Sequence, residues 1–524
     1  MTRSINAEHL TESIANAFQL ISYAHPPDYI RSLSSAYDRD ESPTAKAAIA
    51  QILVNSHMSF TGKRPICQDT GITNVFIKLG IDARLTGASR GLQPLVDEGV
   101  RRAYQNSANP LRASIVESPL FERHNTRDNT PAIVHTEIVP GDLITVTCVA
   151  KGGGSENKSR FTVLNPSDSV SDWVVDTVST LGAGWCPPGI LGIGVGGTAE
   201  KAMLLAKESL IEPLNKADLL RDGPASSTDE LRMEIYHRVN SMGIGAQGLG
   251  GITTVLDVKI RSYPTHASAL PVGLIPNCAA NRHITFTLDG SGPVQLEPSR
   301  LQDWPEIVLN ETKHAVRRVN MDTLTRAGVA SWKIGETLLL SGTMLTARDA
   351  AHKRLVSLLE SGSPLPVNLR DRVLYYVGPV DPAPGEVVGP AGPTTSTRMD
   401  PFTETLLQHT GLLAMVGKAE RSPDTVQSIA RHGAAYMIAV GGAAYLVSKA
   451  IKASRVVAFE ELSIEAIFEF KVEDMPVIVA CDVTGKSLHE EGPKNWARPV
   501  QRLSPTATKD SSRSVAVRRQ NTIQ

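Results

Sequence analysis

Five cysteines are the residues of this 524-residue chain whose type and surroundings most directly suggest chemistry. Three lie in turn sequences rich in Pro or Gly: Cys67 in RPICQDTG, Cys186 in GAGWCPPG and Cys278 in LIPNCAAN. Cys148 and Cys481 lie instead in the apolar runs DLITVTCVA and VIVACDV, where a cysteine packs as a small buried hydrophobe. Three loop cysteines suit a shared metal or iron–sulfur cluster, but no two are close enough to form a local ligand motif.

Three thiolates on a four-iron cluster would leave one iron without a protein ligand, able to act as a Lewis acid on a substrate oxygen. Cations in expected turns suit a small dicarboxylate substrate. Arg348 begins a helix pattern, Thr394 and Arg398 follow a Gly/Pro loop, and Lys418 follows a strand pattern. Arginine binds carboxylate through two N–H groups, so two or three such cations could hold both ends of the substrate. Each arginine taken alone is more often part of a surface ion pair.

Two glycine patterns, GIGVGG at 192–197 and GIGAQG at 243–248, match the spacing of a dinucleotide-binding loop. That loop needs a strand before it, a helix after it and an acidic residue about 20 positions further on. The first pattern enters a helix, but no strand ending in an acid follows, and the second lacks the preceding strand. Close approach of backbone segments is therefore the favoured interpretation of these glycines.

Composition excludes several classes of protein. A net charge of −1 and 5% aromatic residues give no support for a nucleic-acid partner. No run approaches the ~18 unbroken apolar residues of a membrane span, and the first 20 residues predict no secretory signal. Five cysteines, odd in number and widely spaced, do not form a disulfide framework, so we expect a reducing, cytoplasmic location.

The elements that must position these residues change in character along the chain. Amphipathic helices occupy about the first 60 residues, and short strand patterns with loops rich in Gly, Asn and Ser follow. The polar stretch 302–333 has a helical pattern and predicts a connection between two domains. From about residue 334, strands alternate with helices, which predicts an α/β domain.

Eight sequence blocks together resemble the class I fumarate hydratases. The blocks are GKRPICQDTG, NTRDNTPA, KGGGSENKS, GAGWCPPGILGIGVGGTAEKA, GIGAQGLGG, YPTHASALPVGLIPNCAANRH, SGTMLTARDAAH and GPTTSTRMD. The resemblance covers residues 45–497. It implies two domains, an N-terminal α+β cluster-binding domain and a C-terminal swivelling β/β/α domain, with the site between them. We place the N-terminal domain at 1–305, the linker at 306–333, the C-terminal domain at 334–502 and a disordered tail at 503–524.

The resemblance also implies roles for individual residues. Cys67, Cys186 and Cys278 match the three ligands of a [4Fe–4S] cluster. Thr394 matches the proposed base at C3 of malate, and Asp69 is the expected proton donor. The positions that match substrate-binding residues are Gln68, Arg112, Gly154, Arg348, Arg398 and Lys418. His266 matches a histidine that reaches the active site of the neighbouring subunit, because the family is homodimeric.

The resulting hypothesis is reversible hydration of fumarate to (S)-malate. Tartrate dehydratase and mesaconate hydratase are alternatives within the same family, although the fused chain favours the fumarate enzyme. One extra methyl or hydroxyl on a substrate changes affinity by only about 1–3 kcal/mol, so a single residue could decide between these substrates. A non-enzymatic iron–sulfur sensor would not need the carboxylate-binding residues.

Overall fold

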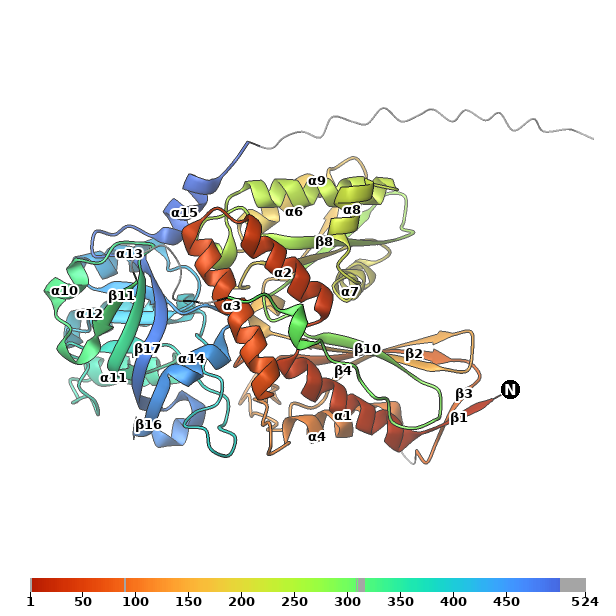
Figure 1. Ribbon diagram of the computed structural model, residues 1–524, viewed down its shortest axis with the longest axis horizontal. Helices are drawn as coiled ribbons and strands as arrows, with labels where there is room; N and C mark the ends of the chain where they lie inside the picture. Colours follow the sequence, from red (N-terminus) through yellow and green to blue (C-terminus); the bar gives the residue numbers. More distant parts are fainter. Residues whose placement is uncertain (1, 89–90, 308, 310–315, 500–524) are drawn as a thin grey trace, which may run out of the picture.

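The computed structural model describes most of the chain, namely residues 2–88, 91–307, 309 and 316–499. The tail predicted at 503–524 lies outside the described residues. We call the residues up to 307 the N-terminal part and those from 316 onward the C-terminal part. The two parts lie side by side, with α3 between them (Figure 1). Mixed helices and sheets confirm the α/β character expected from the sequence.

Three helices begin the N-terminal part: α1 (Ala7–Tyr23), α2 (Pro27–Arg39) and α3 (Pro43–Gly62). The side chain of Ser42 accepts a hydrogen bond from the Ala45 N–H and thereby caps α3, with proline at the first helical position. Most of α3 is buried, because it packs on both parts of the molecule.

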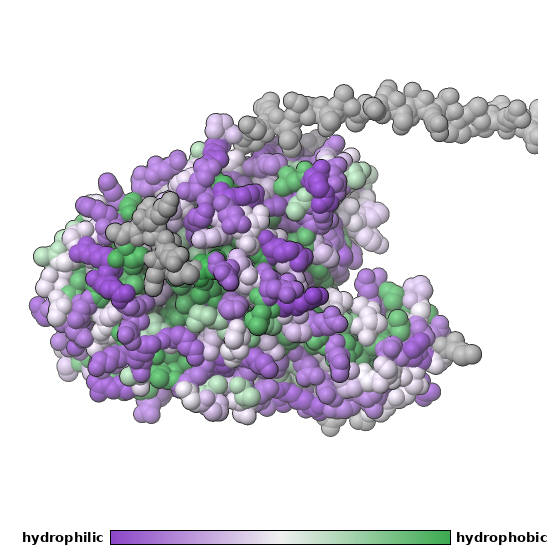
Figure 2. All heavy atoms as spheres, in the orientation of Figure 1, coloured by the Kyte–Doolittle hydropathy of each residue, from purple (hydrophilic) through white to green (hydrophobic). Residues whose placement is uncertain are grey.

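Two four-stranded sheets follow in the N-terminal part. The first has the order β10-β5-β2-β4, with strands β2 (Ile72–Gly80), β4 (Ile133–Val139), β5 (Ile144–Lys151) and β10 (His283–Leu288). The second has the order β6-β9-β7-β8, with strands β6 (Arg160–Leu164), β7 (Gly189–Gly196), β8 (Val255–Tyr263) and β9 (Leu270–Asn277). These sheets form two lobes with a hollow between them on the right of Figure 2.

Residues 192–196 of the first glycine pattern lie within β7 instead of in a loop. A Cβ on Gly192 would lie 2.2 Å from the carbonyl oxygen of Ala206, and one on Gly194 would lie 2.0 Å from that of Ala202. Both oxygens belong to α7 (Ala199–Ser209), which crosses the strand at this point. Glycine is therefore required at these two positions for the close packing of α7 on β7, which agrees with the close backbone approach predicted from the sequence.

The C-terminal part is built on a seven-stranded sheet with the order β11-β12-β13-β14-β15-β17-β16. Strands β11 to β15 pair with one another in parallel. Strand β17 pairs antiparallel with β12, β15 and β16. The strands are β11 (Arg317–Asn320), β12 (Thr337–Thr346), β13 (Val373–Tyr375), β14 (Ala414–Gly417), β15 (Ala435–Ile438), β16 (Ile451–Ala458) and β17 (Ile467–Cys481). The helices packed around them are α11 (Asp349–Glu360), α12 (Asp400–Thr410), α13 (Pro423–Arg431) and α14 (Ala444–Ala450).

The helix predicted at 302–333 is wrong for most of the residues that the structure describes in that stretch. Residues 317–320 form β11, and only Arg326–Ala330 form an α-helix, α10. The stretch Arg317–Asn320 pairs with β12, and pairing with an existing strand outweighs a weak helical preference. Residues 310–315 lie outside the described part.

The remaining elements complete the N-terminal part and the end of the chain. They are β1 (Arg3–Asn6), β3 (Ala83–Thr86), α4 (Leu92–Tyr104), α5 (Gly153–Glu156), α6 (Val170–Ser179), α8 (Lys216–Asp222), α9 (Ser227–Ser241) and α15 (Leu488–Trp496). Among the described residues, no helix combines the length and apolar character that crossing a membrane requires.

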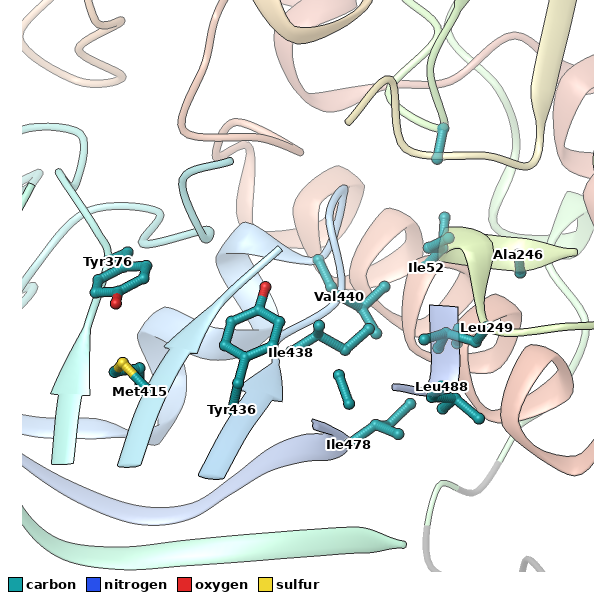
Figure 3. Packing of buried hydrophobic residues seen from close by; sticks show 14 of the residues in the cluster. Ile52, Ala246, Leu249, Tyr376, Met415, Tyr436, Ile438, Val440, Ile478 and Leu488 are labelled. Carbon is teal, nitrogen blue, oxygen red and sulfur yellow. The ribbon is translucent and has the colours of Figure 1, made fainter. Parts of the chain in front are cut away.

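The largest hydrophobic cluster belongs to both parts of the molecule. Ile52 and Leu249 of the N-terminal part lie beside Val440 and Leu488 of the C-terminal part (Figure 3). Burial of such side chains stabilises by about 1.5–3 kcal/mol each. The contact between the two parts is therefore a packed core, and the loops beside it are held in a fixed arrangement.

Candidate active site

Three of the five cysteines line one cavity. Cys67, Cys186 and Cys278 all face it, whereas Cys148 and Cys481 are fully buried in β5 and β17. All five thiols are free. In the described part of the chain, no group of three His, Cys, Asp or Glu is arranged to hold a single metal ion. A cluster takes each thiolate on a different iron, so its ligands lie farther apart than those of one ion.

Strand pairing brings the cysteine loops together. Ile190 at the start of β7 pairs with Asn277 at the end of β9, so the loops that carry Cys186 and Cys278 meet. The Ala279 N–H donates to the Cys186 carbonyl at 3.1 Å and joins these loops directly. Gly189 allows this approach, because a Cβ there would lie 1.9 Å from the Asn277 oxygen.

Strand pairing also places the Cys67 loop beside the glycine-rich segment that follows β5. Ile72, at the start of β2, pairs with Lys151 at the end of β5. The turn that precedes β2 carries Cys67 and Asp69, and the short helix α5 that follows β5 carries Gly154. All three residues line the cavity. Loop residues far apart in sequence therefore meet because the ends of neighbouring strands meet.

A lysine from the C-terminal part reaches the thiols. Lys418 Nζ lies 3.2 Å from Cys186 Sγ, and its side chain is buried. Burial raises the pKa of the Cys186 thiol to about 11, and the Lys418 charge opposes part of that rise. Burial also raises the pKa of Cys67, opposed by Lys418 and Arg282. Metal binding needs thiolates, so these cations favour the state that binds metal.

Asp69 is held as a carboxylate. Its Oδ2 accepts a hydrogen bond from the Gly153 N–H at 2.8 Å, and its Oδ1 accepts one from the Gly71 N–H at 3.1 Å. Burial alone would raise the pKa of Asp69, but Arg112, Arg282 and Lys418 lower it below its ordinary value. To act as the proton donor expected from the sequence, Asp69 must therefore first take up a proton.

Three arginines form a cationic group beside this cavity. Arg112 Nη1 donates to the Gly378 carbonyl at 2.7 Å, and a Cβ on Gly378 would lie 2.5 Å from Arg348 Nη1. Arg398 lies 3.4 Å from Asp349, which is also 4.0 Å from Arg348. Burial and the Arg348 charge lower the pKa of Arg112. Arg348 also lies 3.6 Å from Glu465, so the three arginines face two carboxylates, Asp349 and Glu465. One positive charge remains in excess, as a site for an anion requires.

Thr394 and Gln68 lie where the two parts meet. The Thr394 N–H donates to the Tyr376 carbonyl at 2.7 Å, and the Thr394 carbonyl accepts from the Lys418 N–H at 3.1 Å. Gln68 Nε2 donates to the Pro393 carbonyl at 3.0 Å, which fixes the residue just before Thr394. The main chain thus positions Thr394 relative to both Lys418 and the Cys67 loop.

His266 is not brought to the cavity of its own chain. It lies on the exposed loop between β8 and β9, where its Nδ1 is 2.9 Å from Ser268 Oγ. It is not among the residues that line the cavity.

Two amide side chains that the sequence analysis missed join the parts beside the cysteines. Gln247 Nε2 donates to the carbonyls of Pro187 and Gly441, and its Oε1 accepts from the Gly441 N–H. Asn55 Nδ2 donates to the Gly442 carbonyl at 2.9 Å. The GIGAQG pattern therefore serves the junction of the two parts. For Gln247, the only sequence signal was an amide side chain within a glycine pattern.

A salt bridge that the sequence analysis also missed joins the Cys67 turn to the C-terminal part. Arg64 pairs with Glu386 at 3.0 Å, and both side chains are largely buried. Arg64 is the first residue of the RPICQDTG block, so the bridge anchors the segment that leads to Cys67.

Comparison with known proteins identifies the family. The family model for fumarate hydratase (fumerase) matches residues 11–287, and the model for the fumarase C-terminus matches residues 290–492. The chain is 29% identical to the class I, anaerobic fumarate hydratase of Escherichia coli, covering 93% of this chain and 90% of that protein. It is 30% identical to fumarate hydratase 2 of Leishmania major, covering 93% and 87%. The chain therefore belongs to the class I fumarate hydratase family.

A shorter match covers about half of this chain. A Methanocaldococcus jannaschii chain, named as the alpha subunit of an L(+)-tartrate dehydratase, is 32% identical over 52% of this chain and 95% of its own length.

Proposed function

We propose that this protein catalyses the reversible hydration of fumarate to (S)-malate. The observation that carries the proposal is the family match along both parts of the chain. It is supported by a cavity that three thiols and Lys418 line, with the arginine group beside it. The enzyme is a carbon–oxygen lyase.

The residues present fit a [4Fe–4S] cluster held by Cys67, Cys186 and Cys278. Their thiols are free and face one cavity, and Lys418 lies in hydrogen-bond contact with one of them. When bound, such a cluster with three protein thiolates supplies one open iron as a Lewis acid for a substrate oxygen.

The remaining residues would bind the substrate and move its proton. Arg112, Arg348, Arg398 and Lys418 hold the carboxylates, because guanidinium and ammonium groups donate charge-assisted hydrogen bonds to them. Gln68 and the main chain at Gly154 orient the bound dicarboxylate. The Thr394 hydroxyl takes or returns the proton at C3. A bare hydroxyl is a weak base, so a neighbouring cation must favour its deprotonated form.

Asp69 would serve the second proton transfer. Its carboxylate lies among Arg112, Arg282 and Lys418, and a negatively charged substrate entering this group would weaken their effect on its pKa. Asp69 could then carry the proton that leaves with the hydroxyl group as water.

We also propose a homodimer in which His266 serves the partner's site. The edge strands β4 and β6 expose apolar side chains, including Ile138 at 69% and Val163 at 55%. Such strands favour pairing with another surface. A cytoplasmic location and the division into a cluster-binding domain, a linker and a swivelling domain remain part of the proposal.

A complementation experiment tests the shared site. Arg398→Ala damages the site of its own chain, and His266→Ala damages only the partner's site. In a mixed dimer one site carries both changes and the other carries none, so we expect up to half of that dimer's activity to return. If subunits exchange and no activity returns, His266 acts within its own chain.

The activity is tested by anaerobic purification, iron reconstitution and separate rates on fumarate, mesaconate and tartrate. We expect fumarate and malate to be converted with the highest kcat/KM. A higher kcat/KM for tartrate, which the Methanocaldococcus relative makes the leading alternative, would change the substrate assignment. Cluster uptake without turnover of any of the three would support a sensor instead.

A further inference from the structure

Arg282 is a buried arginine beside the cysteines with two unpaired nitrogen atoms. It is 1% exposed and lies in the loop between β9 and β10, four residues after Cys278. Its Nη1 donates to the Asp69 carbonyl at 2.7 Å. Its Nε and Nη2 have no hydrogen-bond partner within the described ranges.

The other buried arginines of the described residues each have a carboxylate partner. Four arginines are classed as buried in the described part of the chain. Arg64 pairs with Glu386, Arg232 with Asp257 and Arg421 with Asp400. Among the described residues, Arg282 has no such carboxylate partner. Burying an unpaired charge is costly, so an arginine kept in this state indicates an anion that the protein chain itself does not supply.

The unpaired nitrogens belong to the cavity that the cysteines line. Arg282 is one of its lining residues, and Nη2 lies 3.5 Å from the position of a Cβ on Gly152, which also lines it. Asp69, the nearest carboxylate, already accepts hydrogen bonds from Gly153 and Gly71. The free donors therefore face a space in which an anion can be placed.

The position of Arg282 favours the cluster over the substrate carboxylates. Arg282 lines the same cavity as Cys67, Cys186 and Cys278, whereas the three arginines of the cationic group are not among its lining residues. Its main-chain carbonyl accepts from the Ala150 N–H at 3.0 Å, so it is also fixed to the end of β5. Arg282 thus joins the Cys67, Cys278 and glycine loops on the N-terminal side of the cavity.

We propose that Arg282 is a positioning residue that donates its Nε and Nη2 hydrogen bonds to the sulfur atoms of the cluster and holds the Cys67–Asp69 turn through Nη1. This inference rests on the proposed function, because it requires the cluster. Hydrogen bonds to cluster sulfur tune its reduction potential and the retention of iron.

The test compares Arg282→Lys and Arg282→Met with the wild type after anaerobic reconstitution. Arg232→Lys is the matched control, because it changes a buried arginine that already has a carboxylate partner. Iron and sulfide content, the rate of iron loss in air and the electron paramagnetic resonance signal of the three-iron form are measured. Loss of such outer partners typically weakens metal binding about 10- to 100-fold, so we expect Arg282→Met to lose iron faster by about that factor.

Two further measurements separate this role from a merely structural one. The iron-free Arg282→Met protein should be no less stable to unfolding than the iron-free wild type, because removal of the unpaired buried charge offsets loss of the Nη1 hydrogen bond. KM for malate should stay unchanged in molecules that retain the cluster. Arg282→Lys should recover part of the iron retention.

Three results would overturn the inference. The first is iron retention in Arg282→Met equal to that of the wild type. The second is a loss of unfolding free energy in iron-free Arg282→Met as large as that in the iron-loaded variant. The third is a raised KM with unchanged iron retention. The third would assign the anion to the substrate carboxylate. Failure of the wild type itself to take up iron would instead refute the proposed cluster, and the inference with it.

Discussion

The two parts of the molecule bring different chemistry to the same cavity. The N-terminal part supplies three thiols and Asp69 from loops at the ends of strands in two small sheets. The C-terminal part supplies Lys418 to the cavity and places Arg348 and Arg398 beside it, around one seven-stranded sheet. Soft thiols select iron, and cations select carboxylates. We expect from this difference that retention of the proposed cluster and recognition of the proposed substrate can be altered separately.

The largest effect is expected at the loop cysteines. Cys67→Ser, Cys186→Ser and Cys278→Ser should each abolish cluster content and activity, because the hydroxyl of serine is a poor ligand for iron. Cys148→Ser and Cys481→Ser lie in buried strands and should keep the cluster. Iron and sulfide analysis of the five proteins checks this, and a full cluster in Cys186→Ser would refute the ligand assignment.

Removing Arg348, a cation of the C-terminal part that does not line the cysteine cavity, should spare the cluster. Loss of a hydrogen bond to a charged group costs about 1.5–3 kcal/mol, so Arg348→Ala should lower kcat/KM about 10- to 100-fold. Arg431→Ala is the control, because its side chain is 65% exposed and pairs only with Glu404. Iron content is measured alongside the rates. Loss of iron in Arg348→Ala would show that the two functions are not separable.

Gly189→Ala tests how the N-terminal part positions its cysteines. The added Cβ would lie 1.9 Å from the Asn277 oxygen, so the Cys186 and Cys278 loops must move apart. We expect a loss of about 1–3 kcal/mol in unfolding free energy together with incomplete cluster loading. Gly328→Ala in α10 is the control, and should be neutral or stabilise by up to about 1 kcal/mol. Denaturant unfolding and iron analysis decide the outcome, and normal loading of Gly189→Ala would contradict this account.

Gln247→Leu tests the junction between the two parts. It removes the partner of the Gly441 N–H, and an unsatisfied buried donor costs about 1–3 kcal/mol. Exposed Gln105 gives the control, Gln105→Leu, with an expected change within about 0.5 kcal/mol. Stability is measured by denaturant unfolding and cluster retention by iron analysis. If Gln247→Leu behaved like its control, the junction would depend on hydrophobic packing alone.

Local patterns were sufficient to predict much of this protein. The turn or strand context separated Cys67, Cys186 and Cys278 from Cys148 and Cys481, because proline and glycine mark turns while alternating apolar residues mark buried strands. Alternating strands and helices predicted the C-terminal α/β arrangement. Sequence blocks identified the family, which the family models and the full-length relatives confirm.

Only the tertiary structure decided which residues meet. Arg282 resembles any other arginine in sequence, and its unpaired nitrogens become evident only when strand pairing places it among the cysteines. Gln247 and Asn55 likewise acquire a role only where the two parts join. The helical pattern at 302–333 was wrong because β12 offers Arg317–Asn320 a paired edge. Secondary structure follows local spacing, whereas burial, charge pairing and strand partnership depend on contacts between residues hundreds of positions apart.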